Sequence, residues 1–152
     1  MTTSISVSRT VAALPDQVWA LIADLPRMGE WSPENTGGSW TKGATGPDVG
    51  ARFTGTNANG HRQWKTSVKV TRCEPGRAFA FDVTVGMVKV ANWAYTLAPA
   101  DAGCVVTETW TDQRGWLAKT LGGPVSGVKE RADHNRDGME ATLAALAASV
   151  EG

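Results

Sequence analysis

Residues 62–112 read RQWKTSVKVTRCEPGRAFAFDVTVGMVKVANWAYTLAPADAGCVVTETWTD, and this stretch decides the fold. Apolar and polar residues alternate within it in four runs, at residues 62–73, 77–85, 88–98 and 104–112. The turn-forming segments Glu74-Pro75-Gly76 and 99–103 separate these runs where hairpins would reverse the chain. Alternation between turns of this length predicts an antiparallel meander with one dry face.

Side chains of one parity in each run mark the face that we expect to be dry. They are Trp64, Thr66, Val68 and Val70; Phe79, Phe81, Val83 and Val85; Trp93, Tyr95 and Leu97; and Val106, Glu108 and Trp110. Successive side chains of a strand point to opposite sides of the sheet, so these residues should share one surface. That surface is apolar with a few polar exceptions.

The chain before residue 62 predicts further strands and a helix. Residues 4–12 alternate and read as a strand, and Leu14-Pro15-Asp16 predicts a helix start, with Pro26 limiting the helix. Residues 28–33 form a turn-rich segment that carries Trp31. Glycine is dense between residues 37 and 60, which indicates bends and bulges in a strongly curved sheet.

The hydrophobic period changes at the end of the chain. Residues 127–150 carry apolar or small side chains near a spacing of 3.6, which predicts one long amphipathic helix. Before it, Trp116, Leu117 and Leu121 precede the flexible break at Gly122-Gly123. We interpret this segment either as a flap beside a cavity entrance or as a cap on the end of the core.

Composition narrows the class of protein. The 152 residues fit a single domain, and 15 basic residues balance 15 acidic ones, so no electrostatic footprint for nucleic acid is present. The first residues lack the pattern of a signal peptide, and no stretch approaches the ~20 apolar residues of a membrane span. Cys73 and Cys104 are read as reduced, outward-facing thiols. We expect a cytoplasmic protein without stable membrane insertion, as a monomer or homodimer.

A curved sheet held away from a helix leaves a hollow, and a hollow apolar interior is the default site for a ligand. The aromatic and apolar candidates for contacting a small hydrophobic molecule are Trp31, Phe53, Trp64, Phe81, Trp93, Trp110, Trp116 and Met139. The alternative is that these side chains simply fill a large core.

Polar residues on the inner face are the second set of candidates. Tyr95, Glu108 and Asn57 share parity with apolar neighbours, and Asn135 falls on the apolar stripe of the long helix. Arg52 has the opposite parity to Phe53 and would reach the hollow only through a bulge. Glu108, Tyr95 and Arg52 are the candidate catalytic groups. An unpaired buried Glu108 would have a raised pKa and could transfer a proton, whereas a satisfied internal network is the alternative.

Standard catalytic and cofactor motifs are not found in the sequence. His61 lies in a turn and His134 on a flank of the long helix, where it could be solvated or touch a ligand at the rim. Two separated histidines and two outward cysteines do not make a metal site. The glycine-rich region feeds strands and not helix N-termini, so it is not a nucleotide fingerprint. We expect neither a metal nor a cofactor.

The order of elements, with several short motifs, resembles a known superfamily. The motifs are Pro15-Asp16-Gln17-Val18-Trp19, Glu30-Trp31-Ser32-Pro33, residues 49–57, Glu74-Pro75-Gly76-Arg77-Ala78-Phe79, Trp93-Ala94-Tyr95-Thr96-Leu97 and Val106-Thr107-Glu108-Thr109-Trp110. The whole chain is similar to the START-like or Bet v 1-like (SRPBCC) superfamily, and within it to the bacterial polyketide cyclase/dehydrase and lipid transport group. The resemblance implies an α+β helix-grip fold, in which a curved antiparallel sheet of six to seven strands surrounds a long C-terminal helix.

Three functions remain compatible with this resemblance, because the superfamily contains proteins of several kinds. The first is the binding of a lipid, sterol-like or aromatic polyketide-like molecule between sheet and helix. The second is a cyclase or dehydratase that folds a flexible polyketone in the same cavity. The third is a protein-interaction module.

Overall fold

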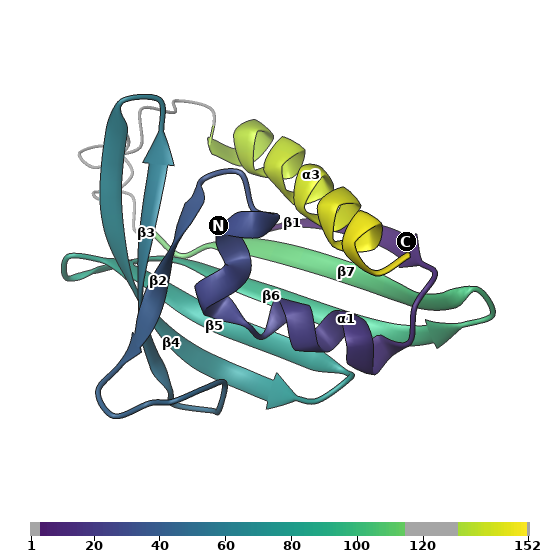
Figure 1. Cartoon of the computed structure of the whole chain (residues 1–152). Helices are drawn as coiled ribbons and strands as arrows, with labels where there is room; N and C mark the ends of the chain where they lie inside the picture. Colours follow the sequence, from purple (N-terminus) through teal and green to yellow (C-terminus); the bar gives the residue numbers. More distant parts are fainter. Residues whose placement is uncertain (1–3, 115–130, 152) are drawn as a thin grey trace.

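A single curved sheet organises the protein, whose computed structural model describes residues 4–114 and 131–151 (Figure 1). Seven antiparallel strands are hydrogen-bonded in the order β1-β7-β6-β5-β4-β3-β2. Their bounds are β1 Ser4–Val11, β2 Asn35–Thr41, β3 Arg52–Asn59, β4 Arg62–Glu74, β5 Ala78–Val85, β6 Val88–Ala100 and β7 Gly103–Asp112. The predicted α+β helix-grip fold is confirmed.

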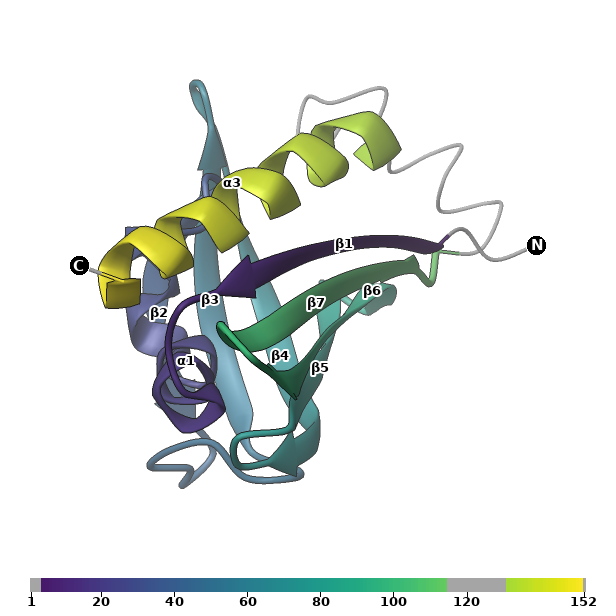
Figure 2. The same ribbon diagram turned by 90° about the vertical axis from the view of Figure 1, so that its right-hand side faces the viewer.

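In the described part of the chain, three helices accompany the sheet. Helix α1 (Pro15–Ile22) and the 3₁₀ helix η1 (Leu25–Glu30) follow β1, and α3 (Arg131–Glu151) ends the chain. Figure 2 shows α3 running alongside β1, with α1 at the end of α3 that is nearer the C-terminus. The start of the long helix was predicted at residue 127, but residues 127–130 lie outside the described part of the chain. The segment interpreted as a flap, with Trp116, Leu117 and Leu121, also lies outside it.

The apolar stripe of α3 closes the core. Leu143, Leu146 and Ala147 are almost fully buried and join Val18 and Ile22 of α1 in one hydrophobic cluster with the sheet. Burying a leucine side chain contributes about 1.5–3 kcal/mol, so these contacts hold the helix in place. The opposite side of α3, including Ala144, is exposed.

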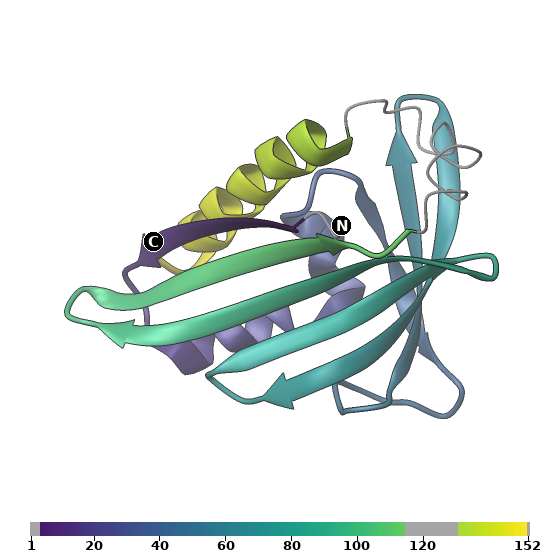
Figure 3. The same cartoon turned by 180° about the vertical axis from the view of Figure 1, so that it is seen from behind.

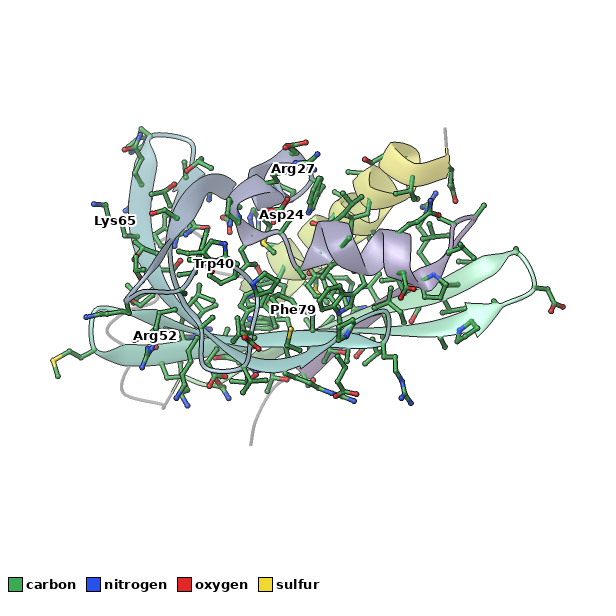
Figure 4. All side chains as sticks on the ribbon, turned by 60° about the horizontal axis from the view of Figure 1, so that its bottom comes forward. Asp24, Arg27, Trp40, Arg52, Lys65 and Phe79 are labelled. Atoms are coloured by element: carbon green, nitrogen blue, oxygen red, sulfur yellow. The ribbon has the colours of Figure 1, made fainter. Side chains whose placement is uncertain are left out.

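Trp19 fixes α1 to the sheet. Its indole Nε1–H donates a hydrogen bond to the carbonyl oxygen of Ala78 in β5 at 2.8 Å, and its ring meets Phe79 edge-on at 6.2 Å between centroids. Figure 4 shows the Phe79 side chain between the sheet and α1. The aromatic contact and the hydrogen bond together determine how α1 sits on the sheet.

The strand pairing is irregular at three places, one of which lies at the start of the glycine-rich region between residues 37 and 60. The register shifts in β2 between Asn35 and Gly37, in β4 between Val70 and Arg72, and in β6 at Val90. Gly38 has a φ of +150°, and a Cβ at this position would lie 2.1 Å from the carbonyl oxygen of Thr54. Only glycine allows the two strands to approach this closely.

The outer face of the sheet, which Figure 3 shows from behind, carries polar side chains where β1 and β7 pair. Ser6 and Ser8 form hydroxyl hydrogen bonds of 2.8 Å with Thr109 and Thr107, and all of these side chains are on the exposed surface. Because polar residues take this face, the opposite side chains of β7 must point inward. The alternation in the sequence therefore assigns the two faces correctly.

Some details of the sequence interpretation are corrected. Cys104 is fully buried in the core and not outward, because it shares parity with Val106 on the inner face of β7. Strand β6 continues to Ala100, through residues that were assigned to a turn. The segment after α1 is a 3₁₀ helix up to Glu30 and not only a turn. No helix in the described part of the chain is long and apolar enough to cross a membrane.

Candidate functional site

A cavity of about 580 Å³ lies between the sheet, η1 and α3. Strands β3 to β7 supply most of its wall, Leu25 and Met28 of η1 close one side, and Asn135, Gly138, Met139 and Thr142 of α3 face it from above. Apolar side chains dominate the wall, with a small number of polar groups between them. This composition and size are typical of pockets for small molecules.

Paired strands bring the aromatic side chains together. Trp93 of β6 lies directly opposite Trp110 of β7 in the register, and their ring centroids are 6.5 Å apart with the planes inclined at 46°. Phe81 of β5 is the partner of Trp93 on the other side. Three adjacent strands thus present a continuous aromatic surface to the cavity.

The next pair on the same face of these two strands is polar. Tyr95 lies opposite Glu108, and the tyrosine hydroxyl donates a hydrogen bond to Oε2 of Glu108 at 2.8 Å. The two residues are 3% and 2% exposed, so both polar groups are out of contact with bulk solvent. Oε1 of Glu108 is buried and has no hydrogen-bond partner within the described residues.

Burial sets the protonation of this pair. It raises the pKa of Glu108 from the ordinary 4.5 to about 8, against the smaller opposite effect of the hydrogen bond from Tyr95. Burial, followed by the adjacent Glu108 carboxyl, raises the pKa of Tyr95 well above 10. At neutral pH the pair therefore consists of a neutral carboxylic acid and a neutral phenol.

A second polar group, formed by Asn57 and Thr66, lies on β3 and β4. The Asn57 side-chain Nδ2 donates a hydrogen bond to the Thr66 hydroxyl at 3.3 Å. Gly55 makes room for this contact, because a Cβ there would lie 2.8 Å from the same hydroxyl oxygen. The hydrogen bond leaves Asn57 with further polar atoms on the cavity wall.

Charged side chains occur at another part of the wall. His134 of α3 and Glu34, which precedes β2, approach to 3.1 Å between Nε2 and Oε2. The guanidinium of Arg114 donates two hydrogen bonds to the Asp112 carboxylate, at 3.0 Å and 2.9 Å, so its charge is balanced locally. These pairs are part-buried, whereas Glu108 and Tyr95 are fully enclosed.

The structure brings most of the predicted site residues to this cavity. Those on its wall are Phe53, Asn57, Trp64, Phe81, Trp93, Tyr95, Glu108, Trp110, Asn135 and Met139. Trp31 is buried elsewhere, with the Arg27 guanidinium 5.5 Å from its ring centroid. Arg52 is exposed on the other face of β3, away from the cavity, because no bulge changes its parity (Figure 4). Trp116 lies outside the described residues.

Several wall residues were not predicted. The register of β5 and β6 shifts by one residue, pairing Val83 with Ala91 but Thr84 with Lys89. Alternation changes phase at this bulge, so Val90 lines the cavity together with Ala91. Leu25 and Met28 were missed because the sequence indicates no orientation for η1. His134 was considered only as a possible rim contact, and its place on the wall depends on how α3 is rotated.

The described residues hold no cluster of three or more histidine, cysteine or acidic side chains arranged for a metal.

The fold and cavity define a helix-grip protein with an internal pocket. A family model for polyketide cyclase/dehydrase and lipid transport proteins matches residues 2–151, and the chain belongs to this family. It also belongs to the wider SRPBCC superfamily. Among curated protein sequences, none matches the chain significantly.

Solved structures agree with this assignment. A polyketide-cyclase-like protein of Corynebacterium glutamicum is 32% identical, with a TM-score of 0.66 over 97% of this chain and 90% of its own. The di-domain ARO/CYC protein StfQ of the steffimycin biosynthetic pathway has a TM-score of 0.76 at 14% identity, and 99% of this chain covers 51% of it. Major latex-like protein 151 of Panax ginseng reaches 0.73 at 13% identity, over 99% and 98% of the two chains. The last two similarities concern the fold.

Proposed function

We propose that the protein binds a small hydrophobic molecule in the cavity between the sheet and α3. The observation that carries this proposal is a cavity of about 580 Å³ whose wall combines apolar side chains with a few oriented polar groups. Interiors of proteins are normally close-packed, and unfilled apolar space destabilises a core by about 24 cal/mol per Å³. A cavity of this size is therefore more easily understood as a binding site than as a packing fault.

Membership of the family is compatible with this function, since its description includes lipid transport as well as cyclisation and dehydration. The rings of Trp93, Trp110 and Phe81 offer polarisable faces that suit fused rings as well as alkyl chains. The ligand is expected to be lipid-like, sterol-like or an aromatic polyketide.

A cyclase or dehydratase that uses the same cavity is the second candidate. The pKa of about 8 for Glu108 favours it, because an acid with a pKa near the working pH can transfer a proton to or from a bound polyketone. Such an enzyme would also draw on the shape of the cavity to hold a flexible chain in a reactive conformation. Turnover of a polyketone by the wild-type protein, lost on replacing Glu108, would select this candidate.

The binding proposal is tested by filling the cavity. Gly138 lies on the wall and Ala144 on the exposed side of the same helix, so Gly138→Phe and Ala144→Phe form a matched pair. With the neutral dye N-phenylnaphthylamine, we expect Gly138→Phe to weaken binding at least about tenfold and Ala144→Phe to leave it unchanged. Equal binding by both variants, with both shown to be folded by circular dichroism, would contradict the proposal.

Native mass spectrometry followed by denaturation gives an independent readout. A small molecule that copurifies with the wild-type protein and is released on unfolding identifies the ligand directly. Its absence from Gly138→Phe and its presence in Ala144→Phe would place it in the cavity.

A further inference from the structure

We propose that the Glu108–Tyr95 pair selects an uncharged ligand that carries a hydrogen-bond-accepting oxygen, such as a ketone or ester carbonyl, in an otherwise apolar molecule. This inference rests on the proposed binding function and specifies the class of ligand. It starts from one atom, Oε1 of Glu108, which is buried on the cavity wall without a hydrogen-bond partner in the described chain.

The hydrogen bond from Tyr95 determines which oxygen of Glu108 is free. The tyrosine hydroxyl donates to Oε2, and the carbonyl oxygen of a carboxylic acid is a better acceptor than its hydroxyl oxygen. In the neutral acid the proton therefore belongs on Oε1. The free oxygen is thus a donor, and the complementary group on a ligand is an acceptor.

The surroundings of the pair favour an uncharged partner. Trp110 and Val106 flank Glu108 on the inner face of β7, and Val7 is its partner on β1. Within the described residues no basic side chain forms an ion pair with Glu108. A ligand carboxylate beside Glu108 would lose its hydration without a free cation among the described residues to balance it, since Arg114 on the wall is already paired with Asp112. It would also be repelled once Glu108 ionises.

Access to the free oxygen requires only a local motion. Oε1 is shielded from solvent, but the terminal torsion of a glutamate side chain is broad and low in energy. The carboxyl group can turn toward a molecule seated against Trp93 and Trp110 while one of its oxygens keeps the bond from Tyr95. A buried donor without a partner destabilises the free protein, so pairing it adds to the affinity of the correct ligand.

Three probes of one shape test the inference: acetylnaphthalene, isopropylnaphthalene and naphthoate, each substituted at the β position. They share the ring system and differ in offering a neutral acceptor, no acceptor or a charged acceptor. By calorimetry at about pH 6, we expect the ketone to bind roughly 3- to 10-fold more tightly than the hydrocarbon, which is the range for one neutral hydrogen bond. Naphthoate should bind most weakly.

Two variants connect the preference to Glu108. Glu108→Gln keeps an amide donor for the ketone and an acceptor for Tyr95, so the preference should persist. Glu108→Leu removes the donor at similar volume, so the ketone and the hydrocarbon should bind equally. The comparison of the three probes with the wild-type protein stands even if Glu108→Leu does not fold.

The pH dependence of the preference for the ketone distinguishes the effect of Glu108 from that of the other titratable or charged groups on the wall. In the described chain these are Tyr95, Glu34, Arg114 and His134. In the wild-type protein the preference for the ketone should disappear as the pH rises through about 8, because the ionised carboxylate has no proton to donate. Glu108→Gln retains all the other groups, so its preference should stay constant.

Different results would overturn the inferred class of ligand and the proposed binding function. Equal affinity of the wild-type protein for ketone and hydrocarbon, or tightest binding of naphthoate, would overturn this inference and leave a binding cavity. Failure of the wild-type protein to bind any of the probes would overturn the proposed function itself.

Discussion

Replacing Glu108 by glutamine should remove a steep dependence of stability on pH. Glu108 has a pKa of about 8 in the folded protein and an ordinary value of 4.5 when the chain unfolds. Between these values the folded state holds a proton that the unfolded state releases. Because the folded state binds more protons, the free energy of unfolding falls as the pH rises through this interval.

The magnitude follows from the two pKa values. Each pH unit between 4.5 and 8 lowers the free energy of unfolding by about 1.4 kcal/mol, so the whole interval accounts for at most about 5 kcal/mol. Below 4.5 the acid is protonated in both states, and above 8 it is ionised in both. The stabilising contribution is therefore fully present at low pH and is lost by about pH 8.

Urea unfolding followed by tryptophan fluorescence, at intervals from pH 5 to pH 9, measures this effect. Glutamine keeps the acceptor for Tyr95 and cannot ionise, so the wild-type value minus the Glu108→Gln value isolates Glu108. The interaction of His134 with Glu34 is present in both proteins and cancels in the difference. A difference that is flat from pH 5 to pH 9 would refute the buried neutral acid. In that case Glu108 would be ionised and satisfied by a partner.

Two further substitutions test packing, one at Gly138 on the cavity wall and one at Trp19, where α1 meets the sheet. Gly138→Ala should raise the free energy of unfolding by about 1 kcal/mol, because alanine favours the helix and the new methyl group meets nothing closer than 4.0 Å. An unchanged or lower midpoint in urea unfolding would contradict this expectation. Trp19→Phe should lower the free energy of unfolding by about 1–3 kcal/mol, since the carbonyl oxygen of Ala78 loses its indole donor. Trp40→Phe is the control, because the Trp40 ring packs edge-on against Phe53 and its indole donates no hydrogen bond to the described residues. Equal effects of the two tryptophan substitutions in thermal unfolding would argue against an anchoring role for the Trp19 bond.

Much of the fold is encoded locally and was predictable. Alternation along β4 and β7 assigns inner and outer faces because successive side chains of a strand point to opposite faces of the sheet. At the end of the chain, apolar residues recur at a spacing near 3.6, which places them on one face of a helix and so identifies α3. Even the inward direction of Glu108 follows from its position between Val106 and Trp110.

What was missed depends on relations between distant segments. Parity places Tyr95 and Glu108 on one face, but only the register shows that they lie opposite one another and share a hydrogen bond. The bulge at Val90 reverses parity in the middle of a strand, which no alternation pattern reveals. His134 and Glu34 meet across 100 positions of sequence, so their contact depends on the docking of α3. Trp31 was predicted to contact the ligand but is buried in the core, so a large aromatic side chain does not by itself indicate a place on the cavity wall.

The position of the Glu108–Tyr95 pair is better explained by a function in ligand binding than by a contribution to folding. A hydrophobic pair of similar volume, such as leucine at position 108 with phenylalanine at position 95, would fill this part of the inner face without burying a carboxyl group or leaving one oxygen unpartnered. Such replacements of buried polar groups are often neutral or stabilising. The chain instead places Glu108 beside unfilled apolar space, so two destabilising features fall on one wall. Local conflicts of this kind are expected where a protein acts on a ligand, because a bound molecule can both fill the space and supply the missing partner.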